Sequence, residues 1–212
     1  MAVGSNNYIY VASQYSRTEG SNGMGMLRAL DLRFGYEKWK RMFNQSLTAA
    51  PAVGTVGGKL AVVVAEGNNR RAPPFSLGEK SQFIMAREPE ADKSTVHVID
   101  AADSSDVWSY QIEEQFGASA KLDVETANTC NPSLFGSPMI SADGTVYITW
   151  SGGKIYALKD IDSDGQVQHL NPLEVGSYTT GYGSNGESAM APGLLVSPTC
   201  ETIYAFKSVT PE

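Results

Sequence analysis

Residues 29–39 read ALDLRFGYEKW: an apolar stretch, an acidic residue, a glycine and then a tryptophan. Residues 98–108 read VIDAADSSDVW, and aligning the two stretches superimposes the acidic residues and the tryptophans. Each stretch predicts a β-hairpin, because two short apolar segments flank a turn rich in Gly, Asp or Ser. Two hairpins of the same length indicate an internal repeat, which has to be defined before strands are assigned.

The repeat extends over most of the chain. IYALKD around Ala157 and IYAFK around Ala205 are shorter copies of the hairpin start. A second pattern precedes the copies: an apolar strand, a turn rich in Gly, Asn or Asp, and an alternating strand. Together they predict units of four antiparallel strands at about 1–43, 50–112, 137–170 and 191–207. The last strand of the third unit is expected at 166–170, and the fourth unit is expected to have only the strands 191–196 and 202–207.

Four-stranded antiparallel sheets repeated along a chain are typical of a β-propeller. We therefore expect a single all-β domain over residues 1–212, with about 3.5 blades. Propellers have four to eight blades, so an arc of this size leaves sheet edges open to pairing. The chain could be part of a longer one, could close by associating with itself or a partner, or could form an irregular four-bladed ring. We favour the first, because Met1 falls within a repeat.

The pattern Ala-x-Asp-x-x-x-Gly-x-x-x-Trp resembles the tryptophan-docking motif of the quinoprotein-like (PQQ-like) β-propeller family. In that family the alanine lies on the third strand and packs under a tryptophan of a neighbouring blade. The motif residues in this chain are Ala29, Asp31, Gly35, Trp39, Val98, Asp100 and Trp108. Ser104 replaces the second glycine, and the third copy departs further, with Lys159 and His169 at the acid and tryptophan positions. The resemblance also implies an extracytoplasmic or organelle-lumen location, for example the thylakoid or ER lumen.

Long insertions interrupt the repeats at 14–25, 66–93, 113–135 and 171–190. The alternation of strand direction predicts that they lie on one face. Long loops on a rigid scaffold commonly carry binding, although loops without a binding role remain an alternative. The partner contacts that we expect in the insertions are Arg70, Arg71, Phe75, Phe83, Phe116 and Phe135.

Residues 160–165, DIDSDG, resemble the start of a calcium loop, with Asp160, Asp162 and Asp164 at alternating positions before a glycine. The twelfth position of such a loop is Asn171, where an EF-hand has a bidentate glutamate. The segment also lies between two predicted strands. The stretch therefore predicts an extended hairpin turn, with a calcium site as the alternative.

Composition excludes several functions. The net charge of −7 opposes binding to nucleic-acid phosphates, and no apolar run approaches the ~20 residues that cross a bilayer. The first residues do not have the pattern of a signal peptide. G-x-S-x-G, H-E-x-x-H and C-x-x-C motifs are absent, and the two histidines, His97 and His169, are interpreted as variable strand positions. The glycine-rich residues 20–25 have no lysine that would make a phosphate loop.

The two cysteines, Cys130 and Cys200, are predicted on opposite faces of the scaffold, so we expect them not to be bonded to each other. The quinone-dependent dehydrogenases of the resembled family have adjacent cysteines over the cofactor. This chain has no such pair, so we expect no quinone cofactor.

The sequence therefore favours a non-catalytic interaction scaffold or a peripheral subunit of a larger assembly. We expect other protein subunits as partners, and no cofactor apart from the candidate calcium ion. Two alternatives stay open: a quinoprotein dehydrogenase-like domain whose active residues lie in missing blades, and a sensor that binds calcium or a small ligand.

Overall fold

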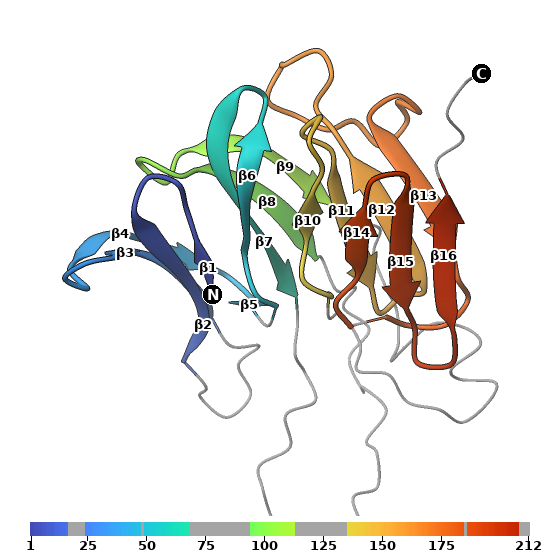
Figure 1. Cartoon of the computed structure of the whole chain (residues 1–212), viewed down its shortest axis with the longest axis horizontal. Coiled ribbons are helices and arrows are strands. Elements are labelled where there is room, and N and C mark those ends of the chain that lie inside the picture. The colour runs from blue at the N-terminus through green and yellow to red at the C-terminus, as the bar shows by residue number, and fades with distance from the viewer. Residues whose placement is uncertain (17–23, 48, 68–93, 113–134, 185, 208–212) are drawn as a thin grey trace, which may run out of the picture.

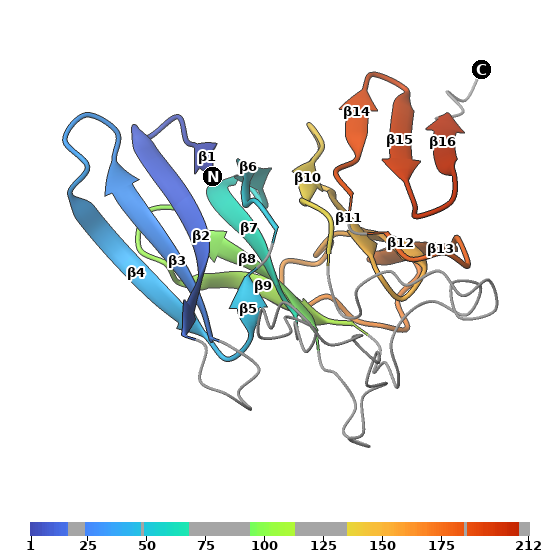
Figure 2. The ribbon, with the colours of Figure 1, turned by 90° about the horizontal axis from the view of Figure 1, so that it is seen from below.

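The computed structural model describes residues 1–16, 24–47, 49–67, 94–112, 135–184 and 186–207. Across these ranges the chain forms strands and turns, with no α-helix. The strands make four separate antiparallel sheets, which follow one another in chain order (Figures 1 and 2). The expected all-β class is confirmed, and within the described ranges no sheet closes on itself.

The first two sheets lie where the repeats predict them. The first is a meander of β1 (Ala2–Val3), β2 (Tyr8–Ser16), β3 (Met24–Asp31) and β4 (Glu37–Phe43). The second contains β6 (Ala52–Val56), β7 (Lys59–Gly67), β8 (Thr95–Asp100) and β9 (Asp106–Gln111), and the short strand β5 (Ser46–Leu47) also pairs with β7. In each, a turn of five residues (32–36 and 101–105) joins the third and fourth strands, as expected for a hairpin.

The third sheet contains β10 (Met139–Ile140), β11 (Val146–Trp150), β12 (Lys154–Leu158) and β13 (Val175–Thr179). The fourth has three strands, β14 (Ala189–Ala191), β15 (Leu194–Pro198) and β16 (Ile203–Lys207). Three sequence predictions are therefore wrong. The third sheet takes its last strand from 175–179 instead of 166–170, and the range 171–190, which was predicted to be a loop, contains that strand. The fourth sheet has three strands instead of the two expected at 191–196 and 202–207, because the short strand β14 precedes the strand that the sequence identified as the first.

The reason for the first error is that residues 166–170 dock on the neighbouring sheet. Val167 is 6% exposed and belongs to the core between the second and third sheets. Gln166 forms an isolated parallel bridge with Ser109 of β9. The alternation in this stretch therefore comes from a turn that packs one side chain inward and places its neighbours in solvent.

Two hydrophobic cores join the first three sheets. The core between the first and second sheets includes Tyr10, Leu27, Ala29, Val62, Val64 and Ile99. The core between the second and third sheets includes Val63, Val98, Trp108, Ile148, Tyr156 and Leu158. Strand β7 contributes to both, which explains its continuous apolar run: both of its faces are buried, so it does not alternate with polar residues.

The hairpin motif has the same geometry in the first and second sheets. Ala29 pairs with Trp39, and Val98 pairs with Trp108. Trp39 also reaches the next sheet, where its Nε1–H donates to the carbonyl oxygen of Ala101 at 3.2 Å. The half-buried Trp39 therefore contacts the second sheet, whereas Trp108 is only 1% exposed and belongs to the core between the second and third sheets.

Asp31 closes the first hairpin turn, because its Oδ1 accepts from the amides of Arg33 (3.0 Å) and Phe34 (2.9 Å). In the same turn Gly35 has φ +75°, and its amide donates to the carbonyl oxygen of Asp31 at 2.8 Å. Ser104 occupies the equivalent place with φ +67°, and its backbone amide donates to the carbonyl oxygen of Asp100 at 3.1 Å. The second turn thus holds a serine in the left-handed conformation that favours glycine.

Ser104→Gly is therefore expected to raise the free energy of unfolding by about 0.5–1 kcal/mol, because it relieves this conformation. The bond from Arg41 Nη1 to Ser104 uses the backbone oxygen (3.0 Å), so the variant keeps it. Gly35→Ser is the reverse substitution in the first hairpin turn and should lower the free energy of unfolding by a similar amount. Urea unfolding followed by circular dichroism measures both. A loss of stability in Ser104→Gly would mean that the serine hydroxyl outweighs the backbone strain.

Candidate functional site

An acidic turn, residues 160–165, follows the end of β12 in the third sheet. Asp160 begins it: Oδ1 accepts from the amide of Ser163 at 2.7 Å, and Oδ2 accepts from the amide of Gly165 at 3.0 Å. Ser163 (φ +61°) and Gly165 (φ +86°) turn the chain back on itself. This places the half-buried carboxylate of Asp160 beside the exposed carboxylate of Asp162.

Glu174 brings a third carboxylate to this turn from the residue before β13. Its backbone carbonyl accepts from the amide of Lys159 at 2.9 Å, which continues the pairing of β12 with β13 and holds Glu174 beside the start of the acidic turn. The side chain is only 1% exposed. Its Oε2 accepts from the amide of Gln168 at 2.8 Å, whereas its Oε1 is buried without a hydrogen-bond partner.

Carboxylate oxygens of Asp160, Asp162 and Glu174 lie within 4.8 Å of one another. We call these three residues the carboxylate trio. Two of its members belong to the set predicted from the sequence, and the third does not. Asp164 instead accepts from the amide of Gln166 at 2.8 Å and from Gln168 Nε2 at 3.3 Å.

Sequence spacing could not reveal Glu174. In a calcium loop of the EF-hand type the last ligand would be at Asn171, but the Oδ1 of Asn171 accepts from the amide of Leu173 at 3.1 Å. Its carbonyl oxygen accepts from the amides of Glu174 and Val175, both at 3.0 Å. Asn171 therefore shapes the turn that delivers Glu174. Only the correct position of β13 would have shown that Glu174 returns to Asp160.

A polar hollow of about 400 Å³ lies beside the acidic turn, between the turns of the second and third sheets. Residues on its wall include Lys59, Asp106, Trp108, Asp143, Lys159 and Asp160. Its charges include both signs, and Lys159 is fixed by an ion pair with Asp143 (Nζ to Oδ2, 3.1 Å).

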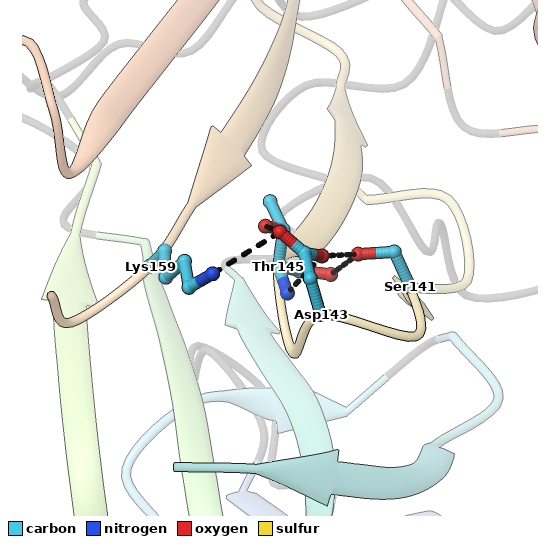
Figure 3. Close-up of polar contacts among 4 residues, drawn as sticks. All are labelled: Ser141, Asp143, Thr145 and Lys159. Atoms are coloured by element: carbon cyan, nitrogen blue, oxygen red, sulfur yellow. Dashed lines mark hydrogen bonds and ion pairs between the residues drawn. The ribbon is translucent and has the colours of Figure 1, made fainter. Parts of the chain in front are cut away.

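Figure 3 shows the network around Asp143 on the wall of this hollow. Its carboxylate accepts from the Ser141 hydroxyl, from Thr145 N (3.2 Å) and Oγ1 (3.0 Å), and from Lys159 Nζ. The hydrogen bond from Ser141, with the ammonium of Lys159 as a further cause, holds the pKa of Asp143 well below its usual range. Each bond closes the β10–β11 turn or joins it to the end of β12, so the network supports the scaffold beside the trio.

The two histidines lie in different environments. His97 Nε2 is 3.1 Å from Glu66 Oε1, and its ring packs edge-on against Phe43 at a centroid distance of 5.1 Å. His169 is exposed and packs against the ring of Tyr110 at 4.5 Å. Neither contacts a serine, threonine or cysteine in these interactions, so their geometry gives no support to nucleophilic catalysis.

The predicted partner contacts fall into two groups. Arg70, Arg71, Phe75, Phe83 and Phe116 lie outside the described residues. Phe135 is described, and its assignment as a partner contact is wrong. It is 3% exposed, forms a bridge with Trp150 and belongs to the core between the second and third sheets, because the chain re-enters the scaffold at this residue.

Cys200 is disulfide-bonded. The chain has one other cysteine, Cys130, which lies outside the described residues, so the prediction that the two are not joined is wrong. The prediction failed because it took the strand before Cys200 as the first of the fourth sheet, whereas β14 precedes it. The turn that contains Cys200 therefore joins a second and a third strand, and such turns lie on the face where the insertions were expected. A structural disulfide is typical of an oxidising compartment.

The fourth sheet has an uncovered face. β16 pairs with β15 along one edge, and no described strand pairs with its other edge. Tyr204 and Phe206 point toward the third sheet, where Tyr178 meets their rings at 5.6 and 5.1 Å. The alternate residues point away, and among them Ile203 is 70% exposed and Leu194 is 42% exposed.

The comparisons with known proteins identify no family. No protein-family model matches the chain, and no curated protein has significant sequence similarity to it. Among the described residues, no helix is long and apolar enough to cross a membrane. Any functional inference therefore rests on the residues and geometry of this chain.

Proposed function

We propose that this chain is a non-catalytic interaction module, one arc of a β-propeller of the PQQ-like type, and that a second copy of the chain completes the ring. The main support is the uncovered face of the fourth sheet. In the first sheet the corresponding face, with Tyr10 and Ala29, packs on the second sheet. In the second sheet the corresponding face, with Val63 and Val98, packs on the third.

The register extends this relation to the fourth sheet. Ala205 is the counterpart of Ala29, Val98 and Ala157 in the repeated hairpin start. It pairs with Val196 and lies two residues after Ile203 on the same strand, so these residues share the uncovered face. An apolar sheet face whose three counterparts lie against a neighbouring sheet is expected to take a further sheet of the same kind.

The first sheet offers a suitable surface for that contact. Its face away from the second sheet contains Val3, Ile9 and Leu30, which are consecutive partners across three strands. Val3 is 59% exposed, and Met42, on the same face, is 39% exposed. Two copies related by a two-fold axis would each place the fourth sheet on the first sheet of the other, giving eight sheets, which is within the range of known propellers.

The test is the mass of the purified particle by light scattering after size-exclusion chromatography. We expect a dimer with about twice the chain mass of 22.7 kDa. Ile203→Lys, which places a charge on the uncovered face, should give the monomer. Leu170→Lys is the matched control, because Leu170 is 96% exposed on the turn before β13. A wild-type monomer over micromolar concentrations would overturn closure by a second copy.

A further inference from the structure

We propose that the carboxylate trio of Asp160, Asp162 and Glu174 binds one calcium ion. The proposal is independent of the proposed self-association. The trio lies just after β12 and just before β13, and none of its residues belongs to the first or fourth sheet, whose faces would meet in the dimer. Exposed acidic residues are common, so the trio alone would carry little weight. The distinguishing observation is that one of the three carboxylates is almost fully buried.

Burial of Glu174 requires compensation. A buried carboxylate is costly unless a hydrogen bond or an opposite charge satisfies each oxygen. One hydrogen bond from the amide of Gln168 serves Oε2, and Oε1 has none. Lys159 follows β12 directly but pairs with Asp143. A cation between Glu174 and the two aspartates would supply the missing charge.

The turn leaves the aspartates able to act as ligands. Each Asp160 oxygen accepts one amide hydrogen bond, and Asp162 Oδ1 accepts one from the amide of Asp164 at 3.2 Å. A carboxylate has about four lone-pair sites, so each aspartate keeps acceptor capacity for a metal. The amide bonds also fix the carboxylates in place before a cation arrives, which reduces the ordering that binding requires.

The ligand chemistry favours calcium. All three groups offer hard carboxylate oxygens, and the trio contains no nitrogen or sulfur ligand of the kind that selects zinc or copper. Magnesium is commonly held by one or two carboxylates, keeps several waters and demands near-ideal octahedral geometry. Calcium accepts six to eight oxygens in irregular geometry, so three carboxylates on a turn and a strand end, completed by water, suit it better.

The experiment measures the melting temperature of the full chain in EDTA, in calcium chloride and in magnesium chloride, together with calcium binding by calorimetry. At a calcium concentration about a hundred times Kd, the wild type should melt about 5–10 °C higher than in EDTA. Magnesium at the same concentration should give a clearly smaller rise. Glu174→Gln keeps the size of the side chain and should abolish most of the calcium-dependent rise.

Two further variants make the result specific. Asp162→Asn changes an exposed member of the trio and should also abolish the rise, even if Glu174→Gln folds poorly. Asp164→Asn removes the same charge from the same turn outside the trio and should keep most of the rise. No calorimetric signal from wild type at millimolar calcium would overturn the proposal. A response lost in Asp164→Asn but kept in Glu174→Gln would overturn the assignment of Glu174 and restore the ligand set predicted from the sequence.

Discussion

Trp108→Ala is expected to lower the free energy of unfolding by about 3–5 kcal/mol, because it removes one of the two tryptophan side chains of the core between the second and third sheets. The side chain is 1% exposed and sits opposite Val98 on the neighbouring strand. The space cannot collapse easily, since rigid strands surround it on both sides. Guanidinium unfolding followed by far-UV circular dichroism measures the loss without depending on tryptophan fluorescence.

Trp108→Phe separates packing from hydrogen bonding. The indole Nε1 of Trp108 is buried without a hydrogen-bond partner, so phenylalanine loses no bond and keeps most of the apolar volume. Its cost should be roughly a third of that of the alanine variant. An alanine variant within about 1 kcal/mol of wild type would contradict the placement of Trp108 in a tight core.

Strands with a strong repeat could be predicted from the sequence because local turn chemistry determines them. In ALDLRFGYEKW, Asp31 accepts amide bonds within its own turn, and Gly35 supplies the left-handed conformation, so the hairpin is encoded within a few residues. The same logic located the hairpin of Trp108, even with Ser104 replacing glycine. Nothing non-local was needed to find these strands.

The last strand of the third sheet could not be predicted in this way, because a tertiary contact decides it. The alternating residues 166–170 have a strand-like pattern, yet Val167 is buried against the second sheet. The strand that does form, β13, is largely exposed and therefore has no apolar pattern to identify it. This single error also hid Glu174, since that residue becomes a neighbour of Asp160 only when β13 pairs with β12.

Cys200→Ser is expected to lower the free energy of unfolding by about 2–5 kcal/mol, near the upper end because the disulfide closes a loop of about 70 residues. The loss of stability should be greater in the fourth sheet than in the other three. Cys200 lies in the turn between β15 and β16, and its amide donates to the carbonyl oxygen of Gly183 at 3.0 Å. The fourth sheet has an uncovered face and no tryptophan hairpin, so it depends on this link more than the first three sheets do.

Hydrogen exchange resolves where the stability is lost. In Cys200→Ser, amides of β15 and β16 should exchange markedly faster, whereas amides of β7 and β8, between the two cores, should keep their protection. Dithiothreitol should destabilise the wild type and leave the variant unchanged, which separates the disulfide from the serine substitution. If the oxidised, unfolded wild type presents two free thiols to a thiol reagent, or if β7 and β15 lose protection equally, the fourth sheet is not held by this bond.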